Sequence, residues 1–433
     1  MALLYFMERD AHYRVYFYIS CYLSMVMAGV AMVWPSPLTA WFSSKNSEVP
    51  MTQDEVSWMV SIGPIGAGLS SIPSGMLADR YGRKPVLLFT GLLSTICWAL
   101  IVSTRTKWTL YGAQVLGGVV VGGLVCVAPI YLSEISPPDI RGAIVGQLST
   151  MSFVGQLIVY AVGPHLTYSH YIWVCFSIPL LFLLTFLMAP ESPYYLMSKG
   201  KEQEAKESML KLRGTDYLME VETSYFELRS NQDIQPEKSL WETLNQDGYV
   251  KHLICLVILS GVSQMDGNAT VSVYGEEFIG GQWVILAMGI VFVVTSFFAS
   301  FLTDPFGRRP LLVSSLIGSA VSTSLLAAYF VTLKDGLLYS GMFGFCIISS
   351  IGINPIILTL PSELFPTRLR ALANGLTQLV ASVVAFITLK MFVPINAVWG
   401  IEGNFIIYTV VSLIGAVSAT LLPETAKTTI SSS

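Results

Sequence analysis

The 433-residue chain has little charge. Asp, Glu, Lys and Arg make up 12% of it, about half the share found in an average soluble protein. Its 24 basic and 28 acidic residues nearly balance, and a net charge of −4 gives no indication of a nucleic-acid partner. Hydrophobic residues make up 53% of the chain, and its mean hydropathy is +0.62. This composition excludes an ordinary soluble protein and predicts a protein that crosses a membrane many times.

The sequence also lacks the residue clusters that enzymes and metalloproteins use. Its six cysteines all lie in apolar stretches, where they are typical of small buried hydrophobic residues and not of a disulfide framework or zinc site. The four histidines show no metal-ligand spacing, and no nucleotide-binding loop or nucleophile constellation is evident. We therefore expect no metal, no cofactor and no enzymatic activity.

Long apolar runs dominate the rest of the sequence. A helix needs about 20 apolar residues to cross the ~30 Å hydrocarbon layer. Only Asp266 lies in the middle of such a run, whereas Lys390 and Glu402 lie near ends. The predicted spans are 15–42, 56–78, 86–104, 108–132, 142–163, 171–189, 253–275, 282–302, 311–333, 337–360, 371–392 and 399–422. Six of these twelve spans precede a polar segment over 191–251, and six follow it.

The distribution of Lys and Arg predicts the direction of these spans. Placing the N-terminus inside assigns 19 of the 24 basic residues to inner segments, so both termini and the polar segment are expected to be cytoplasmic. Glu-to-Lys spacings such as Glu202 to Lys206 favour short helices in that segment. The expected organisation is a leader (1–14), a six-helix half (15–190), a helical linker (191–251), a second six-helix half (252–426) and a tail (427–433).

Three short motifs recur in the same order in the two halves. Residues 79–85 reappear at 304–310, residues 133–141 at 362–370, and residues 190–192 at 423–425, with offsets of 225, 229 and 233. Each copy ends an even-numbered span on the predicted cytoplasmic side. The two halves are therefore expected to run parallel, related by an axis along the membrane normal.

These motifs resemble those of the sugar porter family of the major facilitator superfamily. The resemblance rests on the D-x-x-G-R-[RK] loops, the run from Pro129 to Gly142, and Pro190-Glu-Ser-Pro193, and it covers roughly residues 15–427. The family includes the GLUT hexose carriers, and insect facilitated trehalose transporters look most similar. The resemblance implies an all-α membrane protein with the major facilitator fold. It further implies a monomer in the lipid bilayer of the plasma membrane that moves a sugar down its gradient by alternating access.

The resemblance also implies a gate at the cytoplasmic ends of the spans. Carboxylates and guanidinium groups there form charge-assisted pairs in one state of the carrier and separate in the other. The expected gating residues are Asp79, Arg83, Glu134, Arg141 and Glu191 in the first half, and Asp304, Arg308, Glu363, Arg370 and Glu424 in the second. The alternative is that the basic residues only set topology. Gln114 replaces a usual arginine and Pro305 stands opposite Arg80, so this inner gate is expected to be weak.

Family substrate contacts come from spans five, seven, ten and eleven, and this sequence departs from their pattern. One glutamine of span seven, the second proline and tryptophan of span ten, and the Asn-Trp pair of span eleven (here Ala381-Ser382) are missing. The residues that take the expected substrate-binding positions are Gln264, Asp266, Asn268, Asn354, Pro355, Leu358 and Ser149.

Asp266 leaves three interpretations open. A carboxylate in mid-span costs about 2.5–3.5 kcal/mol on insertion scales, so it usually faces a cavity or a partner. It could bind a polyol, carry a proton, or serve as a protonated structural group bonded to a neighbouring helix. Proton coupling is the least favoured, because span one has no Asp or Glu. Two other functions also remain open, namely a non-transporting sensor, which the altered pocket favours, and a facilitator of a non-sugar polar solute.

Overall fold

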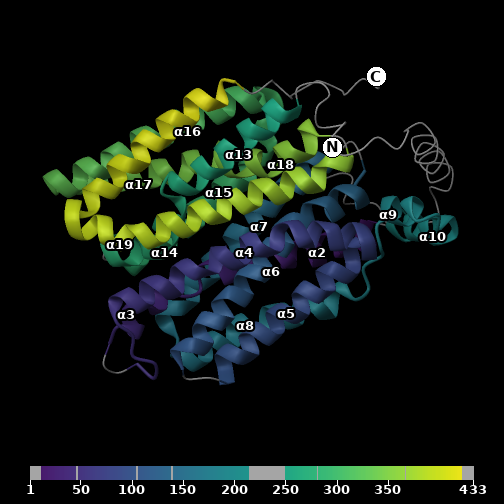
Figure 1. Cartoon of the computed structure of the whole chain (residues 1–433), viewed down its shortest axis with the longest axis horizontal. Helices are drawn as coiled ribbons and strands as arrows, with labels where there is room; N and C mark the ends of the chain where they lie inside the picture. The colour runs from purple at the N-terminus through teal and green to yellow at the C-terminus, as the bar shows by residue number, and fades with distance from the viewer. Residues whose placement is uncertain are drawn as a thin grey trace.

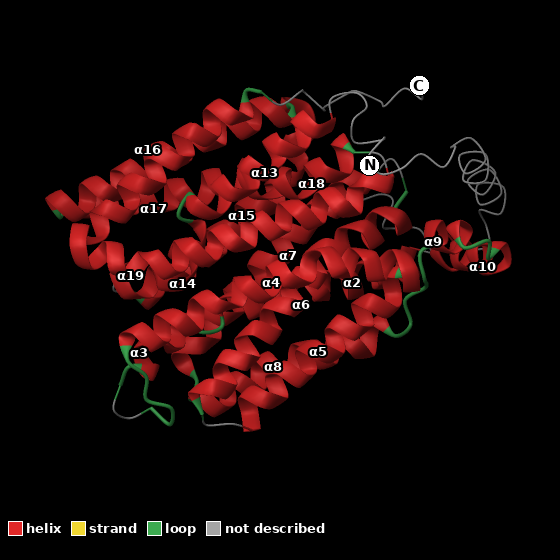
Figure 2. Cartoon of the chain, viewed as in Figure 1, coloured by secondary structure: helices red, strands yellow, loops and turns green. Residues whose placement is uncertain are grey.

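The computed structural model describes residues 11–44, 47–103, 106–137, 140–213, 249–279, 281–365 and 367–421. Over these residues Figure 2 shows only helices and the loops that join them. The expected all-α fold is confirmed.

The first half ends in two short helices that lie outside the bundle. Its helices are α2 (Ala11–Val33), α3 (Thr39–Phe42), α4 (Gln53–Tyr81), α5 (Arg83–Ser103), α6 (Lys107–Ile135), α7 (Arg141–Val162), α8 (Tyr168–Phe186), α9 (Pro193–Ser198) and α10 (Glu202–Arg213). Figure 1 places α9 and α10 at one end of the molecule and α3 at the other. We call these the α9 end and the α3 end.

The second half contains two helices that are interrupted near their middle. Its helices are α13 (Tyr249–Met265), α14 (Asn268–Ile279), α15 (Gln282–Phe306), α16 (Arg308–Thr332), α17 (Asp335–Ile348), α18 (Asn354–Leu364) and α19 (Thr367–Ala419). Residues 266–267 separate α13 from α14, and a π-helical turn over Ser349–Ile353 separates α17 from α18. Each interrupted pair corresponds to one predicted span.

The helices agree with the predicted spans. Nine segments of the described residues are long and apolar enough to cross a membrane. One of them, Leu372–Ala419, contains two predicted spans. Gly400 separates these two spans, because its backbone is not helical (φ 72°, ψ 176°). The remaining two predicted spans lie in α4 and α15. All twelve predicted spans therefore coincide with helical segments.

The internal repeat is visible in the backbone. Gly82 between α4 and α5 has φ 110°, and Gly307, which lies 225 residues later between α15 and α16, has φ 84°. Both glycines adopt a conformation that other residues rarely take, and each reverses the chain between two long helices. The same turn thus occurs at equivalent places in the two halves.

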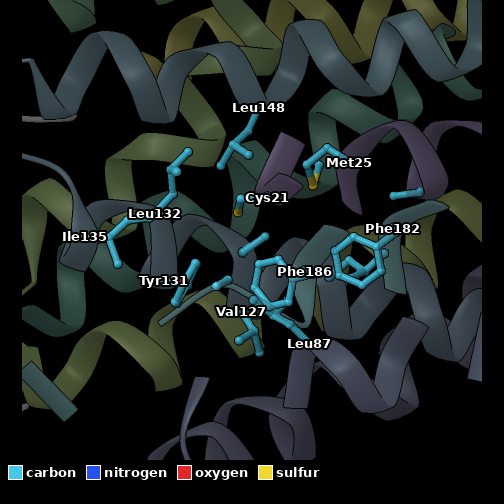
Figure 3. Packing of buried hydrophobic residues seen from close by; sticks show 14 of the residues in the cluster. Cys21, Met25, Leu87, Val127, Tyr131, Leu132, Ile135, Leu148, Phe182 and Phe186 are labelled. Atoms are coloured by element: carbon cyan, nitrogen blue, oxygen red, sulfur yellow. The ribbon is translucent and has the colours of Figure 1, made fainter. Parts of the chain in front are cut away.

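The two halves lie side by side as separate bundles, coloured purple to teal and green to yellow in Figure 1. Helix α4 packs against α19, and α7 packs against α15, across the boundary between them. Inside the first half, buried side chains from several helices interdigitate toward the α9 end (Figure 3). There the Tyr131 ring lies 5.4 Å from Phe186, and the Tyr131 hydroxyl donates to the Pro190 carbonyl at 2.7 Å.

Glycines allow α4 and α6 to pack backbone to backbone. A Cβ atom on Gly118 would overlap the carbonyl oxygen of Gly63, and one on Gly122 would overlap that of Ala67. Apolar burial does not drive the association of helices in lipid. Close packing of small residues is one of the interactions that holds them together there. Gly112 on the same helix has nothing within 4 Å of its Cβ position.

This contrast predicts different outcomes for two matched substitutions in α6. Gly118→Val should destabilise the protein by about 2 kcal/mol, because overpacking forces α4 and α6 apart. Gly112→Val should have little effect. Thermal unfolding of the purified variants in detergent measures the difference, and equal melting temperatures would contradict the close-packing account.

Candidate functional site

The first-half gating residues form a compact ion-pair cluster at the α9 end. The guanidinium group of Arg83 donates to both carboxylate oxygens of Glu134, with Nε–Oε2 and Nη2–Oε1 distances of 3.0 Å. Arg83 also donates to the Ala78 carbonyl at 3.0 Å and lies 3.2 Å from Asp79 Oδ1. The Arg83 and Glu134 side chains are only 13% and 12% exposed. The predicted grouping of Asp79, Arg83 and Glu134 in space is therefore observed.

Glu191 belongs to this cluster but does not pair with a guanidinium group as expected. Its Oε1 atom accepts hydrogen bonds from the backbone N–H groups of Arg83 (3.0 Å), Lys84 (3.2 Å) and Ser192 (2.8 Å). A carboxylate at a helix N-terminus satisfies free N–H groups and interacts favourably with the helix dipole. Glu191 thus caps α5 and ties it to the chain that leads into α9.

Arg141 is not paired with a carboxylate in the described residues. Its Nη2 atom donates to the Ser136 carbonyl at a long 3.5 Å, and its Nε atom is buried without a hydrogen-bond partner there. Arg141 therefore does not form the expected ion pair with any carboxylate of the described residues.

The second-half gating residues are only partly described. Arg308 begins α16, which matches the position of Arg83 at the start of α5. The side chains of Asp304, Glu363 and Arg370 lie outside the described residues, and so does Glu424. The bonds that the structure gives for Asp79, Arg83, Glu134 and Glu191 all stay within the first half. These four residues join the ends of α4, α5, α6 and α9 to one another.

A cavity of about 250 Å³ lies between the two halves. Helices α2, α4, α6 and α7 line it from the first half, and α13, α14, α18 and α19 line it from the second. The described lining residues are all uncharged, and many carry a hydroxyl or carboxamide group. Among the predicted substrate-binding residues, the cavity is lined by Ser149, Gln264, Asn268, Asn354 and Leu358.

Asp266 and Pro355 do not line the cavity, in contrast to the prediction. Asp266 is fully buried, and its Oδ1 atom accepts from the backbone N–H of Asn268 at 2.9 Å. It therefore caps the start of α14, which continues the same predicted span, and its Oδ2 atom has no partner in the described residues. Pro355 lies in the first turn of α18, a position where a proline does not cost a helix hydrogen bond.

The sequence reasoning missed several carboxamide side chains that line the cavity. Gln156 lies on α7, two turns beyond Ser149, and Asn374 and Gln378 lie on α19. These residues are polar groups inside predicted spans, and that signal was available. In spans five and eleven, the family's substrate-contact positions correspond to Ser149 and to Ala381-Ser382 instead.

Gln114 was expected at the inner gate, and this prediction is wrong. The residue lies 20 positions before Glu134 on α6, which places it roughly 30 Å away along the helix. It lines the cavity, and its Oε1 atom accepts from the indole N–H of Trp34 at 2.8 Å. Gln114 thus links α6 to α2 toward the α3 end.

The two interrupted helices of the second half meet at the cavity through Asn268 and Asn354. Asn268 Nδ2 donates to Asn354 Oδ1 at 3.5 Å, and Asn354 Nδ2 donates to the Ser349 carbonyl at 3.3 Å. Two cavity-lining side chains each have a buried carboxamide oxygen without a partner in the described residues, namely Asn268 and, from the first half, Gln156.

The α3 end is closed by contacts between the halves. Lys390 Nζ lies 2.7 Å from Asp54 Oδ1 and 4.3 Å from the centre of the Trp58 ring, which joins α19 to α4. The Tyr160 hydroxyl donates to the Ser272 carbonyl at 2.7 Å, which joins α7 to α14. One buried apolar cluster here contains side chains from both halves. Access to the cavity from this end therefore requires these contacts to separate.

Two bundles around a polar, uncharged cavity define a membrane transporter of the major facilitator fold. The fold is similar to the proton:xylose symporter XylE bound to 6-bromo-6-deoxy-D-glucose, with a TM-score of 0.80, 19% identity and coverage of 96% of this chain and 97% of that chain. The partially occluded inward-open form of the xylose transporter XylE from E. coli gives a TM-score of 0.81 at 20% identity and covers 96% and 99%.

The sequence comparisons identify the family. The family described as "Sugar (and other) transporter" matches residues 22–432, so the chain belongs to it. The human solute carrier family 2, facilitated glucose transporter member 6, is 26% identical over 92% of this chain and 86% of that protein. The facilitated trehalose transporter Tret1 of Bombyx mori is also 26% identical, over 88% of this chain and 78% of that protein.

The Arg83–Glu134 pair predicts an asymmetric effect of two substitutions. Arg83→Ala should destabilise the protein by about 3 kcal/mol, because it leaves a buried carboxylate without its partner. Glu134→Gln should cost less, because it leaves no buried charge without a partner. The Arg83→Ala variant should regain stability as the pH falls, because a protonated Glu134 no longer carries the unpaired charge. Melting temperatures across a pH series would measure this recovery.

The double variant Arg83→Ala/Glu134→Gln provides the control for this prediction. It has no carboxylate at position 134, so its deficit relative to the wild type should not shrink at low pH. A deficit of Arg83→Ala that is the same at every pH would contradict the role assigned to Glu134.

The ion pair at the α3 end predicts a shift in conformation. Lys390→Ala should raise the population that is open at this end, because the pair crosses between the halves. Since Asp54 is 75% exposed, solvent screening limits the effect to about 1 kcal/mol. Distances between spin labels at the α3 ends of α4 and α19 would measure the shift. Lys107→Ala is the matched control, because the Lys107–Glu55 pair stays within the first half. An unchanged distance distribution in Lys390→Ala would contradict the prediction.

Proposed function

We propose that this protein is a facilitative carrier that moves a neutral sugar, such as trehalose or a hexose, across the plasma membrane by alternating access. The observation that carries the proposal is the uncharged cavity between the halves, with carboxamide groups from both halves directed at it. Sugars are recognised by hydroxyl-to-amide hydrogen bonds, and carboxamide side chains line the cavity from both halves, among them Gln156 and Gln264. The named functions of the glucose and trehalose transporter relatives support the same class of substrate.

The proposed orientation places the α9 end and both termini in the cytoplasm, as the Lys and Arg distribution predicts. The cluster around Arg83 then holds the cytoplasmic ends of the first-half helices together, and Arg141 is available to bind a carboxylate when this end closes. Arg308, Asp304, Glu363, Arg370 and Glu424 take the corresponding role in the second half. The carrier acts as a monomer, because the cavity is formed within one chain.

Transport is proposed to be passive. Each described residue that lines the cavity is uncharged, and Asp266 lies behind the lining with its Oδ1 atom engaged by α14. A proton-coupled carrier needs a titratable group that exchanges protons as the substrate binds. The solved relatives include a proton:xylose symporter, so the test has to include a proton gradient.

A second candidate is a facilitator of a neutral polar solute other than a sugar. Phe153 is the one aromatic side chain among the described lining residues, and it stacks on Phe292 at 4.8 Å. Sugar sites commonly offer an aromatic face to the apolar side of the ring. The sparse aromatic lining therefore favours testing small amides and polyols together with sugars.

Uptake into proteoliposomes tests the proposal. Labelled trehalose or glucose should equilibrate across the membrane without accumulating, and an inward proton gradient should not change the final level. Gln156→Ala should reduce uptake by about tenfold, the equivalent of one lost hydrogen bond to the substrate. Empty liposomes provide the background.

Three outcomes would contradict parts of this proposal. Accumulation above the external concentration that an uncoupler abolishes would contradict passive transport. Uptake of a non-sugar solute alone would favour the second candidate. Binding of a sugar without any exchange across the membrane would favour a sensor.

A further inference from the structure

The part of the cavity toward the α3 end contains a polar side chain that a neighbour holds from behind. Gln114 on α6 lines the cavity and is only 5% exposed. Its Oε1 atom accepts from the indole N–H of Trp34 at 2.8 Å. Trp34 is buried and does not belong to the lining. The indole therefore touches the cavity only through the carboxamide that it binds.

We propose that Trp34 is a positioning residue that directs the NH₂ group of Gln114 into the cavity, where this group forms a subsite for an acceptor oxygen of the substrate. The subsite takes a hydroxyl or ether oxygen of a neutral polyol such as a sugar. This inference deepens the proposed function and rests on it for the identity of the ligand.

The orientation of the Gln114 carboxamide follows from the chemistry of its partner. An indole N–H can only donate, so the atom of Gln114 that faces Trp34 has to be the oxygen. The Nε2 atom then lies beside Gly63, where it is 3.1 Å from the position that a Cβ atom would take. Nε2 forms no hydrogen bond with a described residue and keeps accessible surface. Since Gly63 also lines the cavity, the NH₂ group is open to it.

Trp34 is itself held in place by three other contacts. Its carbonyl accepts from the Tyr171 hydroxyl at 2.8 Å, and its backbone N–H donates to the Val30 carbonyl at 2.9 Å. Its ring meets the ring of Trp98 edge to face, with the centroids 5.8 Å apart. The indole N–H is therefore fixed in direction. A carboxamide that is free to rotate presents either of its ends, whereas Gln114 presents only its NH₂ group.

The lining next to Gln114 makes this donor selective. The described residues that α2 and α4 contribute to the cavity have no polar side chain; they are Met25, Ala31, Met32, Val33, Val60, Gly63, Pro64 and Ala67. A ligand that fills the cavity displaces water from the Gln114 NH₂ group, and a buried donor without an acceptor is unfavourable. The subsite therefore favours a ligand that places an oxygen here over one that places a CH₂ group.

A scan of deoxy analogues tests the subsite. With a sugar that the wild type binds, removal of the hydroxyl that contacts Gln114 should weaken binding about tenfold. Gln114→Met keeps a similar volume and removes the carboxamide. This variant should bind that analogue as well as the parent sugar, while the losses at other ring positions remain. A Gln114→Met variant that shows every loss seen in the wild type would overturn the subsite.

Trp34→Phe and Trp98→Phe form a matched pair that tests the positioning role. Both tryptophans are 2% exposed and their rings are in contact, but the bond to Gln114 comes from Trp34. Trp34→Phe should lose most of the discrimination against the deoxy analogue, because the released carboxamide can turn its oxygen inward. It should have little further effect in Gln114→Met, since both changes disturb one contact. Trp98→Phe should keep the discrimination even if its melting temperature falls. Equal losses of discrimination in the two variants would overturn the role of Trp34.

A measurement without a sugar separates this inference from the proposed function. In protein with isotopically labelled indole nitrogens, the NMR signal of Trp34 is identified by its absence in Trp34→Phe. Its N–H should exchange with solvent severalfold faster in Gln114→Met, because the bond to Oε1 is lost. Thr377→Val, a change in the lining on α19, should leave the exchange rate unaltered. An unchanged rate in Gln114→Met overturns the inference even if sugars bind, and failure of all sugars to bind overturns the proposed function alone.

Discussion

The main constraint on this structure is that a helix inside a membrane can be interrupted only where its free backbone groups find other partners. The second half contains two interruptions, one at Asp266–Gly267 and one at Ser349–Ile353, and both lie beside the central cavity. The Asp266 carboxylate replaces a helical partner for the Asn268 N–H, and the Ser349 carbonyl binds the Asn354 side chain. The same interruptions that would be costly in lipid therefore place two asparagines at the cavity.

The fold could be predicted from the sequence because its signals are long and repeated. Twelve apolar runs, a strong Lys and Arg bias and three repeated motifs all point to two parallel six-helix bundles, and the helices agree with them. The Arg83–Glu134 pair was also predictable, since the repeated loop motifs place both residues at span ends. Each of these signals depends only on where a residue lies along the chain. None of them depends on the direction in which its side chain points from the helix.

The cavity could be predicted only in part, because its lining depends on which face of each helix turns inward. Ser149 and Gln156 are two turns apart on α7 and both face the cavity, yet only one was expected. Asp266 is one of the most polar residues in any span, but the φ of Gly267 turns the chain so that its carboxylate binds backbone and Asn268 faces the cavity. Likewise, Gln114 was placed by its motif at the gate, whereas helix length puts it near Trp34.

The structure closes the two ends of the cavity by different means. At the α3 end, apolar packing and the Lys390–Asp54 pair connect one half to the other, whereas the Arg83–Glu134 pair at the α9 end connects helices of the first half. A bound neutral ligand would add contacts from both halves at the centre. The most direct test is therefore a structure determined experimentally with trehalose or glucose bound. The sugar should lie in the cavity between the halves, with hydroxyl groups about 2.7–3.2 Å from carboxamide groups of both halves, such as those of Gln156 and Gln264. A sugar bound outside this cavity, or one in contact with a single half only, would contradict the proposed function.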